Sequence, residues 1–221
     1  MIAENLKEIR SELRERAKLV CVSKFHPNEA IMEAYKTGER SFGENRPQEM
    51  LEKATTLPDD IEWHFIGNLQ TNKVKIVVPY ATIIHSMSNE RLVDEIEKQA
   101  AKIDKIQDVL IELHVAQEES KQGFSPEEVI ALFTREYIDR HTHIRICGVM
   151  GMATNTEDES IVRNDFQKIR DTFNTLKERV FAGDDKFCEI SMGMSGDWRI
   201  ALEYGSTIVR IGSSIFGARQ Y

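Results

Sequence analysis

A lysine at the end of an apolar segment is the residue of this sequence best suited to covalent chemistry. Lys24 stands in the run Val22-Ser23-Lys24-Phe25-His26-Pro27, at the end of a segment of strand character. An amine at the inner end of a strand is costly to desolvate unless it is paired, and desolvation lowers its pKa towards the neutral form. A neutral amine attacks carbonyl groups to form a Schiff base. The alternative is that Lys24 merely extends its amine into solvent.

Two segments near the end of the chain could bind the phosphate group of a ligand. Ser191-Met192-Gly193 and Arg210-Ile211-Gly212-Ser213 each combine a glycine, which lets the backbone approach an anion, with a serine hydroxyl that can donate a hydrogen bond. A phosphate site facing an amine suits a phosphorylated aldehyde. Taken alone, either segment could be an ordinary turn between a strand and a helix.

Strands must bring these residues together, and the sequence contains about eight segments of strand character. They are Leu19–Phe25, Arg40–Gly43, Trp63–Gly67, Thr82–His85, Asp108–Val115, Ile144–Met150, Phe187–Met192 and Thr207–Ile211. Helical patterns alternate with them without a linker, which predicts a single α/β domain over residues 1–221. Eight parallel strands close a (β/α)8 TIM barrel, although an open, doubly wound sheet would show similar segments. In a barrel, functional groups lie at the carboxyl ends of the strands, where Lys24 and both glycine segments are expected.

Helical periodicity is clearest in the second half of the chain. One apolar stripe consists of Val162, Phe166, Ile169, Phe173, Leu176 and Val180. A similar stripe at Ile2, Leu6, Ile9 and Leu13 predicts an additional N-terminal helix that covers the outside or bottom of the barrel. Ser125-Pro126-Glu127-Glu128 predicts the start of another helix, with a capping serine, a proline and a reciprocal glutamate.

Arg210 would lie on the last strand, which neighbours the first strand in a closed barrel. Its guanidinium would then point inward near Lys24. If the phosphorylated aldehyde is borne on a pyridine ring, an arginine that faces the ring nitrogen keeps its own proton and donates to that nitrogen. The ring then stays unprotonated and is a poor electron sink, which restrains carbanion chemistry. The alternative is that Arg210 pairs with a carboxylate such as Glu44 or Glu189.

The composition limits the classes of partner. The formal net charge of the 221-residue chain is −8, which argues against binding to nucleic acid. No apolar run approaches the roughly 20 residues that span a bilayer, and the N-terminus has no apolar signal core. We therefore expect a cytoplasmic protein that binds neither nucleic acid nor membrane. Cys21, Cys147 and Cys188 lie far apart in apolar segments and are expected to be buried thiols, with no disulfide and no metal site.

Ordered motifs along nearly the whole chain resemble the pyridoxal phosphate homeostasis proteins, a family related to the N-terminal barrel domain of alanine racemase. The motifs are Val22-Ser23-Lys24, Phe42-Gly43-Glu44-Asn45, His64-Phe65-Ile66-Gly67, Leu69-Gln70-Thr71-Asn72-Lys73, Ile84-His85-Ser86, Gly148-Val149-Met150-Gly151-Met152, Ser191-Met192-Gly193-Met194-Ser195 and Val209-Arg210-Ile211-Gly212. So many segments in the same order make the resemblance specific.

The resemblance implies a (β/α)8 barrel that holds pyridoxal 5′-phosphate (PLP) as an aldimine on Lys24, with Arg210 near the pyridine nitrogen. It also assigns to the cofactor Ser191, Gly212 and Ser213 at the phosphate, and Asn45 and His85 along the cofactor face. Members of the family are thought to bind PLP and hand it over, buffering the reactive aldehyde, with no established turnover. PLP-dependent apoenzymes are then the expected recipients, and a monomer is the expected state.

Two segments depart from the family pattern. Glu44-Asn45-Arg46-Pro47-Gln48-Glu49 stands where Glu-Asn-Tyr-Val-Gln-Glu is usual, and Leu113-His114-Val115-Ala116 stands where a Gln-Val-Asn-like run is common. Both changes concern the pocket wall near the second and fifth strands.

A racemase needs two acid–base groups on opposite faces of the substrate, and in alanine racemase the second is a tyrosine from a C-terminal domain of the partner subunit. This chain ends at Tyr221 without such a domain, so we expect a cofactor-binding and delivery protein with no dedicated catalytic residue. The tyrosines that could still supply such a group are Tyr35, Tyr80, Tyr137, Tyr204 and Tyr221. The alternatives are a small racemase or related PLP enzyme, a Schiff-base aldolase acting on a sugar phosphate, and a plain interaction domain.

Overall fold

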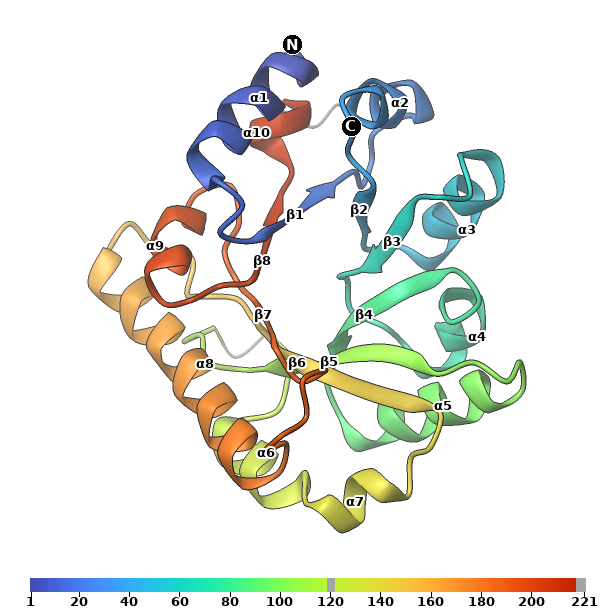
Figure 1. The fold of residues 1–221 in the computed structure, drawn as a ribbon, viewed down its shortest axis with the longest axis vertical. Coiled ribbons are helices and arrows are strands. Elements are labelled where there is room, and N and C mark those ends of the chain that lie inside the picture. Colours follow the sequence, from blue (N-terminus) through green and yellow to red (C-terminus); the bar gives the residue numbers. More distant parts are fainter. Residues whose placement is uncertain (119–121, 218–221) are drawn as a thin grey trace.

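The computed structural model describes residues 1–118 and 122–217, in which eight parallel strands form a closed barrel (Figure 1). The strands are β1 (Lys18–Val22), β2 (Ser41–Glu44), β3 (Glu62–Phe65), β4 (Ala81–Met87), β5 (Gln107–Leu113), β6 (Ile144–Gly151), β7 (Glu189–Ser191) and β8 (Ile208–Ile211). They follow one another around the barrel in sequence order, and β8 pairs with β1, with Val20 opposite Arg210. The predicted (β/α)8 barrel is confirmed, and the open doubly wound sheet is excluded.

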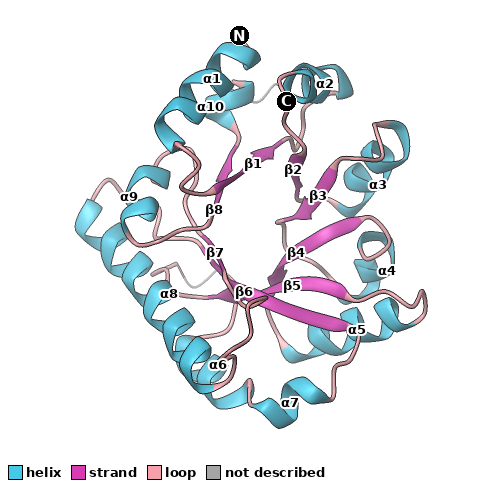
Figure 2. Cartoon of the chain, in the orientation of Figure 1, coloured by secondary structure: helices cyan, strands magenta, loops and turns pink. Residues whose placement is uncertain are grey.

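Helices surround the barrel (Figure 2). They are α1 (Ile2–Leu13), α2 (Asn28–Lys36), α3 (Pro47–Thr56), the 3-10 helix η1 (Thr71–Lys73), α4 (Val74–Val77), α5 (Glu90–Ala101), α6 (Pro126–Leu132), α7 (Arg135–Asp139), α8 (Glu159–Arg179), α9 (Trp198–Glu203) and α10 (Ser213–Phe216). None of the helices in the described ranges is long and apolar enough to cross a membrane.

The first strand ends three residues earlier than predicted, at Val22, because the chain turns sharply behind it. Phe25 has a left-handed φ of 66°, and the His26 N–H donates to the Ser23 carbonyl at 3.0 Å. A residue in the left-handed region cannot continue a strand. Lys24 therefore lies in a turn at the rim of the barrel.

The predicted N-terminal helix is α1, which lies on the outside of the barrel beside α2 and α10 (Figure 1). Leu6, Ile9 and Leu13 form its buried stripe. The Asn5 amide donates to the carbonyl of Ile215 at 2.9 Å and so joins α1 to α10. The helix packs over the seam where β8 meets β1.

The capping sequence at Ser125 works as predicted. The Glu128 N–H donates to the Ser125 hydroxyl at 3.1 Å, and the Ser125 N–H donates to the Glu128 carboxylate at 2.7 Å.

The prediction of buried thiols is confirmed for Cys21 and Cys147 but wrong for Cys188, which is exposed. Cys188 directly precedes β7, which begins at Glu189.

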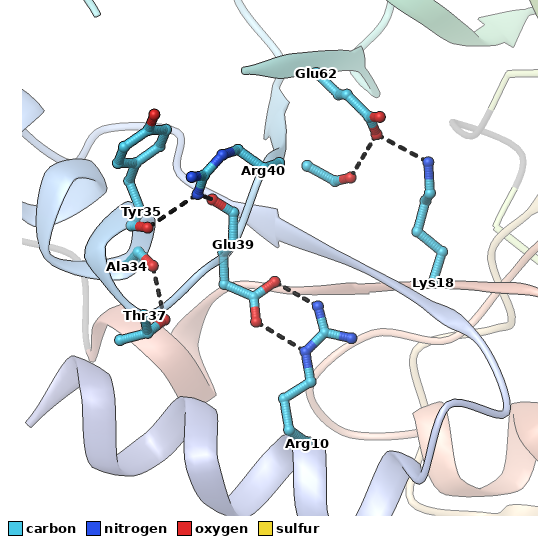
Figure 3. A network of polar contacts seen from close by, with 9 residues as sticks. Arg10, Lys18, Ala34, Tyr35, Thr37, Glu39, Arg40 and Glu62 are labelled. Carbon is cyan, nitrogen blue, oxygen red and sulfur yellow. Dashed lines mark hydrogen bonds and ion pairs between the residues drawn. The ribbon is translucent and has the colours of Figure 1, made fainter. Parts of the chain in front are cut away.

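An ion network ties elements together around the amino ends of the first strands (Figure 3). Arg10 of α1 makes two hydrogen bonds to Glu39, which precedes β2. Lys18 of β1 and Ser41 of β2 both donate to Glu62 of β3, at 2.9 and 2.8 Å. At this end of a barrel such contacts contribute to stability, and chemistry is expected at the other end.

Candidate functional site

A cavity of about 420 Å³ lies at the carboxyl ends of the strands. Its walls bring together predicted site residues from distant parts of the chain: Lys24, Asn45, Arg210, Gly212 and Ser213. The volume lies within the range of small-molecule sites, about 300 to 1,000 Å³. A single cavity therefore combines the lysine with the loop that was expected to bind phosphate.

Two predicted residues, His85 and Ser191, do not line this cavity and lie fully buried within the barrel. Ser195 does line it, although the sequence had given this serine no role. Its signals in the sequence were its place four residues after Ser191 and its inclusion in the motif Ser191-Met192-Gly193-Met194-Ser195.

The loops that follow β7 and β8 meet at the cavity. The Gly212 N–H donates to the Ser195 hydroxyl at 3.3 Å, so the two loops are directly joined. A Cβ on Gly212 would lie 3.2 Å from the carbonyl oxygen of Val22, closer than most side chains tolerate. Glycine at this position thus lets the loop after β8 lie close against the end of β1, next to Ser213.

Gly193 has a packing role instead of a place in the cavity wall. Its φ is 95°, and a Cβ there would lie 2.7 Å from the Cβ of Ala201 and 2.9 Å from the Cα of Trp198. Only glycine combines this left-handed conformation with such a close approach of α9. The turn after β7 depends on it.

Arg210 enters the interior of the barrel from β8 and is held there by several acceptors. Its Nη1 donates to the Ser191 hydroxyl at 2.6 Å and to the Ser191 carbonyl at 2.8 Å, and its Nη2 donates to the Gly151 carbonyl at 3.1 Å. Within residues 1–118 and 122–217 the guanidinium forms no ion pair. Glu44 bonds to Lys53 and Glu189 bonds to Thr207, so the alternative that Arg210 pairs with either of these carboxylates is wrong.

Burial lowers the pKa of Arg210 to about 10, so the guanidinium is still cationic at neutral pH. The nearby acids Asp197 and Glu112 act on it only through space. A fixed, buried positive charge therefore stands at one wall of the cavity.

Behind Arg210 a chain of hydrogen bonds crosses the barrel interior from β8 to β3. The Ser191 hydroxyl lies 2.9 Å from His85 Nδ1, and His85 Nε2 lies 2.9 Å from His64 Nδ1. Burial lowers the pKa of His64 to about 3 and that of His85 well below its usual value, so both imidazoles are neutral. His85 and Ser191 thus orient Arg210 from behind.

One arrangement of protons gives almost every group in this hydrogen-bonded series a partner. The Ser191 hydroxyl accepts from Arg210 and donates to His85 Nδ1, and His85 Nε2 donates to His64 Nδ1. His64 Nε2 is then a buried donor that has no hydrogen-bond partner in the described part of the structure. The direction of these bonds leaves the lone pairs of Ser191 facing the guanidinium.

Asn45, which directly follows β2, lines the cavity together with the residues of the loops after β7 and β8. Its Oδ1 is buried and has no hydrogen-bond partner among the described residues. A Cβ on Gly67 would lie 2.3 Å from the carbonyl oxygen of Asn45, so glycine is required for the two loops to approach. A buried acceptor without a partner is costly unless a ligand supplies a donor.

A further acidic residue on β5, Glu112, was not predicted. It is buried and precedes the segment in which the sequence departs from the family pattern. Burial raises its pKa to about 7, against the opposing effect of the positive charge of Arg210. Glu112 is therefore an acid that titrates near neutral pH inside the barrel.

The sequence matches the model of one protein family along its length. The family is described as "Alanine racemase, N-terminal domain", and the match covers residues 1–220. A protein of Aquifex aeolicus named "Pyridoxal phosphate homeostasis protein" is 44% identical over 206 residues, which is 93% of this chain and 88% of that protein. A human protein of the same name is 37% identical over 92% of this chain and 77% of its own length.

Solved structures show the same architecture. PipY of Synechococcus elongatus, solved with PLP bound, has a TM-score of 0.87 and 32% identity, and the match covers 98% of this chain and all of that chain. The alanine racemase of Bartonella henselae, which carries covalently bound pyridoxal phosphate, has a TM-score of 0.75 at 17% identity. It shares the fold, and this chain covers 58% of its length.

Proposed function

The chain belongs to the family of pyridoxal phosphate homeostasis proteins, within the alanine racemase N-terminal domain family, and from this premise we propose that it binds PLP in the cavity and holds it covalently on Lys24. PLP supplies an aldehyde that condenses with a primary amine and loses water. The protein thereby keeps a reactive aldehyde bound and passes it to apoenzymes that need it. As a carrier it works as a monomer.

One observation carries this proposal: a single cavity joins the Lys24 amine, a buried guanidinium and a loop with serine hydroxyls. Lys24 comes from the turn after β1, whereas Ser195 and Ser213 come from the loops after β7 and β8. Because β8 pairs with β1, the first and last strands of the barrel bring these loops together here. An amine and a set of hydroxyl and backbone donors on one cavity suit a phosphorylated aldehyde.

The remaining walls fit the other groups of PLP. Asn45 offers a buried acceptor that has no partner in the part of the chain that the structure describes, and a donor on the ligand would satisfy it. Arg210 offers N–H donors at a fixed position, and a cationic guanidinium leaves a pyridine nitrogen as an acceptor only. His85 and Ser191 support this role from behind, instead of contacting the ligand.

The same features favour holding PLP over turnover of amino acids. An unprotonated pyridine ring is a weak electron sink, so proton removal from a bound amino acid is slow. The tyrosines of the described chain do not line the cavity: Tyr35, Tyr80, Tyr137 and Tyr204. Tyr221 lies outside the described residues. The relatives are named as homeostasis proteins, which agrees with a carrier.

The test is covalent labelling of the purified protein. PLP is added, the visible absorbance is recorded, the adduct is reduced with borohydride, and the modified lysine is located by peptide mass spectrometry. We expect a visible band that is lost on reduction, and a phosphopyridoxyl group on Lys24 that is missing from Lys24→Ala. Labels scattered over surface lysines, or no band, would contradict the proposal.

A second measurement separates carrier from enzyme. The loaded protein is incubated with amino acids in deuterated water, and exchange of the α-proton is followed by NMR. A carrier gives exchange no faster than free PLP, whereas rapid exchange would indicate a racemase or a related enzyme. An imine trapped on Lys24 with a sugar phosphate, and none with PLP, would instead indicate an aldolase.

A further inference from the structure

A buried cluster of polar and charged groups lies behind the turn that carries Lys24. It consists of Ser23, Glu44 of β2, and Glu49 and Lys53 of α3, and we name it the Lys53 cluster. Lys53 Nζ donates to both carboxylates at 2.7 Å, and the Ser23 hydroxyl donates to Glu44 at 2.6 Å. Lys53 is 5% exposed and Glu44 is fully buried. None of the four lines the cavity.

Fold stability alone does not account for these buried charges. Moving an ion out of water costs several kcal/mol, and a buried ion pair is often no more stabilising than well-packed apolar side chains. The cost is visible at Glu44, since burial raises its pKa to about 7 in spite of the contacts with Lys53 and Ser23. Its Oε2 also has no hydrogen-bond partner in the described ranges.

The cluster makes two bonds to the backbone, one on each side of Lys24. Lys53 Nζ donates to the carbonyl of Ser23 at 2.9 Å. The N–H of Phe25 donates to Glu49 Oε1 at 2.6 Å. The groups that flank Lys24 in the chain are thus both tied to the same buried ammonium and its carboxylate partner.

The conformation that is held in this way is an unfavourable one. Phe25 has a φ of 66°, and the left-handed region costs a residue with a side chain about 1 to 2 kcal/mol. Such a residue keeps its conformation only where its surroundings hold it. The Glu49 carboxylate holds its N–H, and the guanidinium of Arg46 stacks over its ring, 4.4 Å from the ring centre.

We propose that the Lys53 cluster is a positioning device for Lys24. By holding the carbonyl before this residue and the N–H after it, the cluster fixes the backbone from which the amine projects into the cavity. Without it, Phe25 relaxes to a negative φ, and the direction in which Lys24 leaves the barrel rim changes. The consequence for PLP rests on the proposed function, whereas the fixed turn is a property of the ligand-free chain.

The sharpest test compares Glu49→Ala with Glu49→Gln. Alanine removes the acceptor of the Phe25 N–H and leaves the Glu44–Lys53 pair in place, whereas glutamine keeps an acceptor oxygen at the same position. In the ligand-free protein we expect faster hydrogen exchange at the Phe25 amide in Glu49→Ala and near wild-type exchange in Glu49→Gln. With PLP added, we expect Glu49→Ala to form the Lys24 adduct about tenfold more slowly, because small misplacements of a reacting group are costly.

A matched pair of lysine variants separates positioning from general stability. Lys53→Met removes the centre of the cluster. Lys105→Met removes another half-buried ammonium, which donates to the carbonyls of Val78 and Ala81 near the amino end of β4. Both variants lower the thermal midpoint, but only Lys53→Met is expected to slow adduct formation by folded protein.

The outcomes distinguish this proposal from the proposed function. Unchanged exchange at Phe25 in Glu49→Ala would overturn the positioning role, whatever the protein binds. Increased exchange with an unchanged rate of adduct formation would overturn its consequence for Lys24, as would equal slowing by Lys53→Met and Lys105→Met. Failure of the wild type to form any Lys24 adduct would sink the proposed function, and the exchange data would still decide whether the cluster holds the turn.

Discussion

Replacing Glu112 by glutamine should change how the stability of this protein depends on pH. Glu112 is 5% exposed, and burial raises its pKa from 4.5 to about 7 against the opposing effect of Arg210. The unfolded chain restores the ordinary value, so the native state binds this proton more tightly than the unfolded state. The contribution of Glu112 to stability is therefore fully present below pH 4.5 and is lost as the pH rises through about 7.

The size of the effect follows from the two pKa values. Each unit of difference corresponds to about 1.4 kcal/mol, and most of the titration falls between the two values. Raising the pH from about 5 to about 8 should therefore remove about 2 kcal/mol of the contribution that Glu112 makes to the free energy of unfolding. Glu112→Gln keeps the shape of the side chain and removes the titration. Relative to wild type, the variant should gain about 2 kcal/mol of stability over the same interval.

Urea unfolding of the ligand-free proteins at the two pH values measures this difference directly. The control is Glu62→Gln, because the pKa of Glu62 is lowered by its hydrogen bond from Lys18 and this carboxylate is ionised throughout the interval. Glu62→Gln should differ from wild type by the same amount at both pH values. If Glu112→Gln also ran parallel to wild type, Glu112 would not be an acid that titrates near neutral pH.

Three other changes test separate parts of the structure. Gly148→Ala should destabilise the fold by about 3 kcal/mol or more, because Gly148 has a φ of 152° and a Cβ there would lie 1.8 Å from the carbonyl oxygen of Glu189. A urea midpoint near that of the wild type would refute this close approach. Ser195→Ala removes the acceptor of the Gly212 N–H and should weaken PLP binding roughly fivefold in equilibrium dialysis while Lys24 is still labelled, and unchanged affinity would remove Ser195 from the site. His64 stays neutral in the fold and protonates when unfolded, so its contribution to stability is lost as the pH falls below 6.5. His64→Gln should therefore lose less stability than the wild type in acid unfolding followed by circular dichroism.

The fold was predictable because nearly every strand is buried on both faces and most strands contain a short apolar run. In a barrel covered by helices, one face of each strand packs on the helices and the other fills the interior, so short apolar runs mark the strands. The ends of the strands were less accessible. Phe25 looks like a strand residue, and nothing local indicates that Glu49 and Arg46, more than twenty positions later, hold it in a left-handed turn.

The site was predictable to the level of the barrel rim and no deeper. Lys24, Asn45 and Ser213 follow strands, and the carboxyl ends of parallel strands meet at one face. Whether a polar residue within a strand reaches that face depends on the stagger of neighbouring strands, which the sequence does not display. Ser191 and His85 lie one level too deep to line the cavity, and their hydroxyl and imidazole act on Arg210.

The Lys53 cluster illustrates why some functional residues escape sequence reasoning altogether. Glu49 and Lys53 stand four positions apart on α3, the ordinary spacing of an ion pair on a solvated helix surface. Only the structure shows that the lysine is buried against Glu44 and bonded to the carbonyl of Ser23. Charge spacing alone does not distinguish a surface pair from a buried one.

Two buried polar networks end beside the cavity, and each includes an atom whose desolvation is not compensated by a hydrogen bond among the described residues. In the described ranges, the hydrogen-bonded series from His64 to Ser191 leaves a donor without a partner, and the Lys53 cluster leaves an acceptor without one. One network ends on the guanidinium of Arg210, and the other ends on the Ser23 carbonyl and the Phe25 N–H, which flank Lys24 in the chain. The Lys24 amine and the Arg210 guanidinium must be correctly spaced before a ligand binds. Side chains that do not line the cavity therefore hold both groups in place. The atoms without a partner are then the consequence of holding a guanidinium and a lysine-bearing turn rigidly beside one cavity.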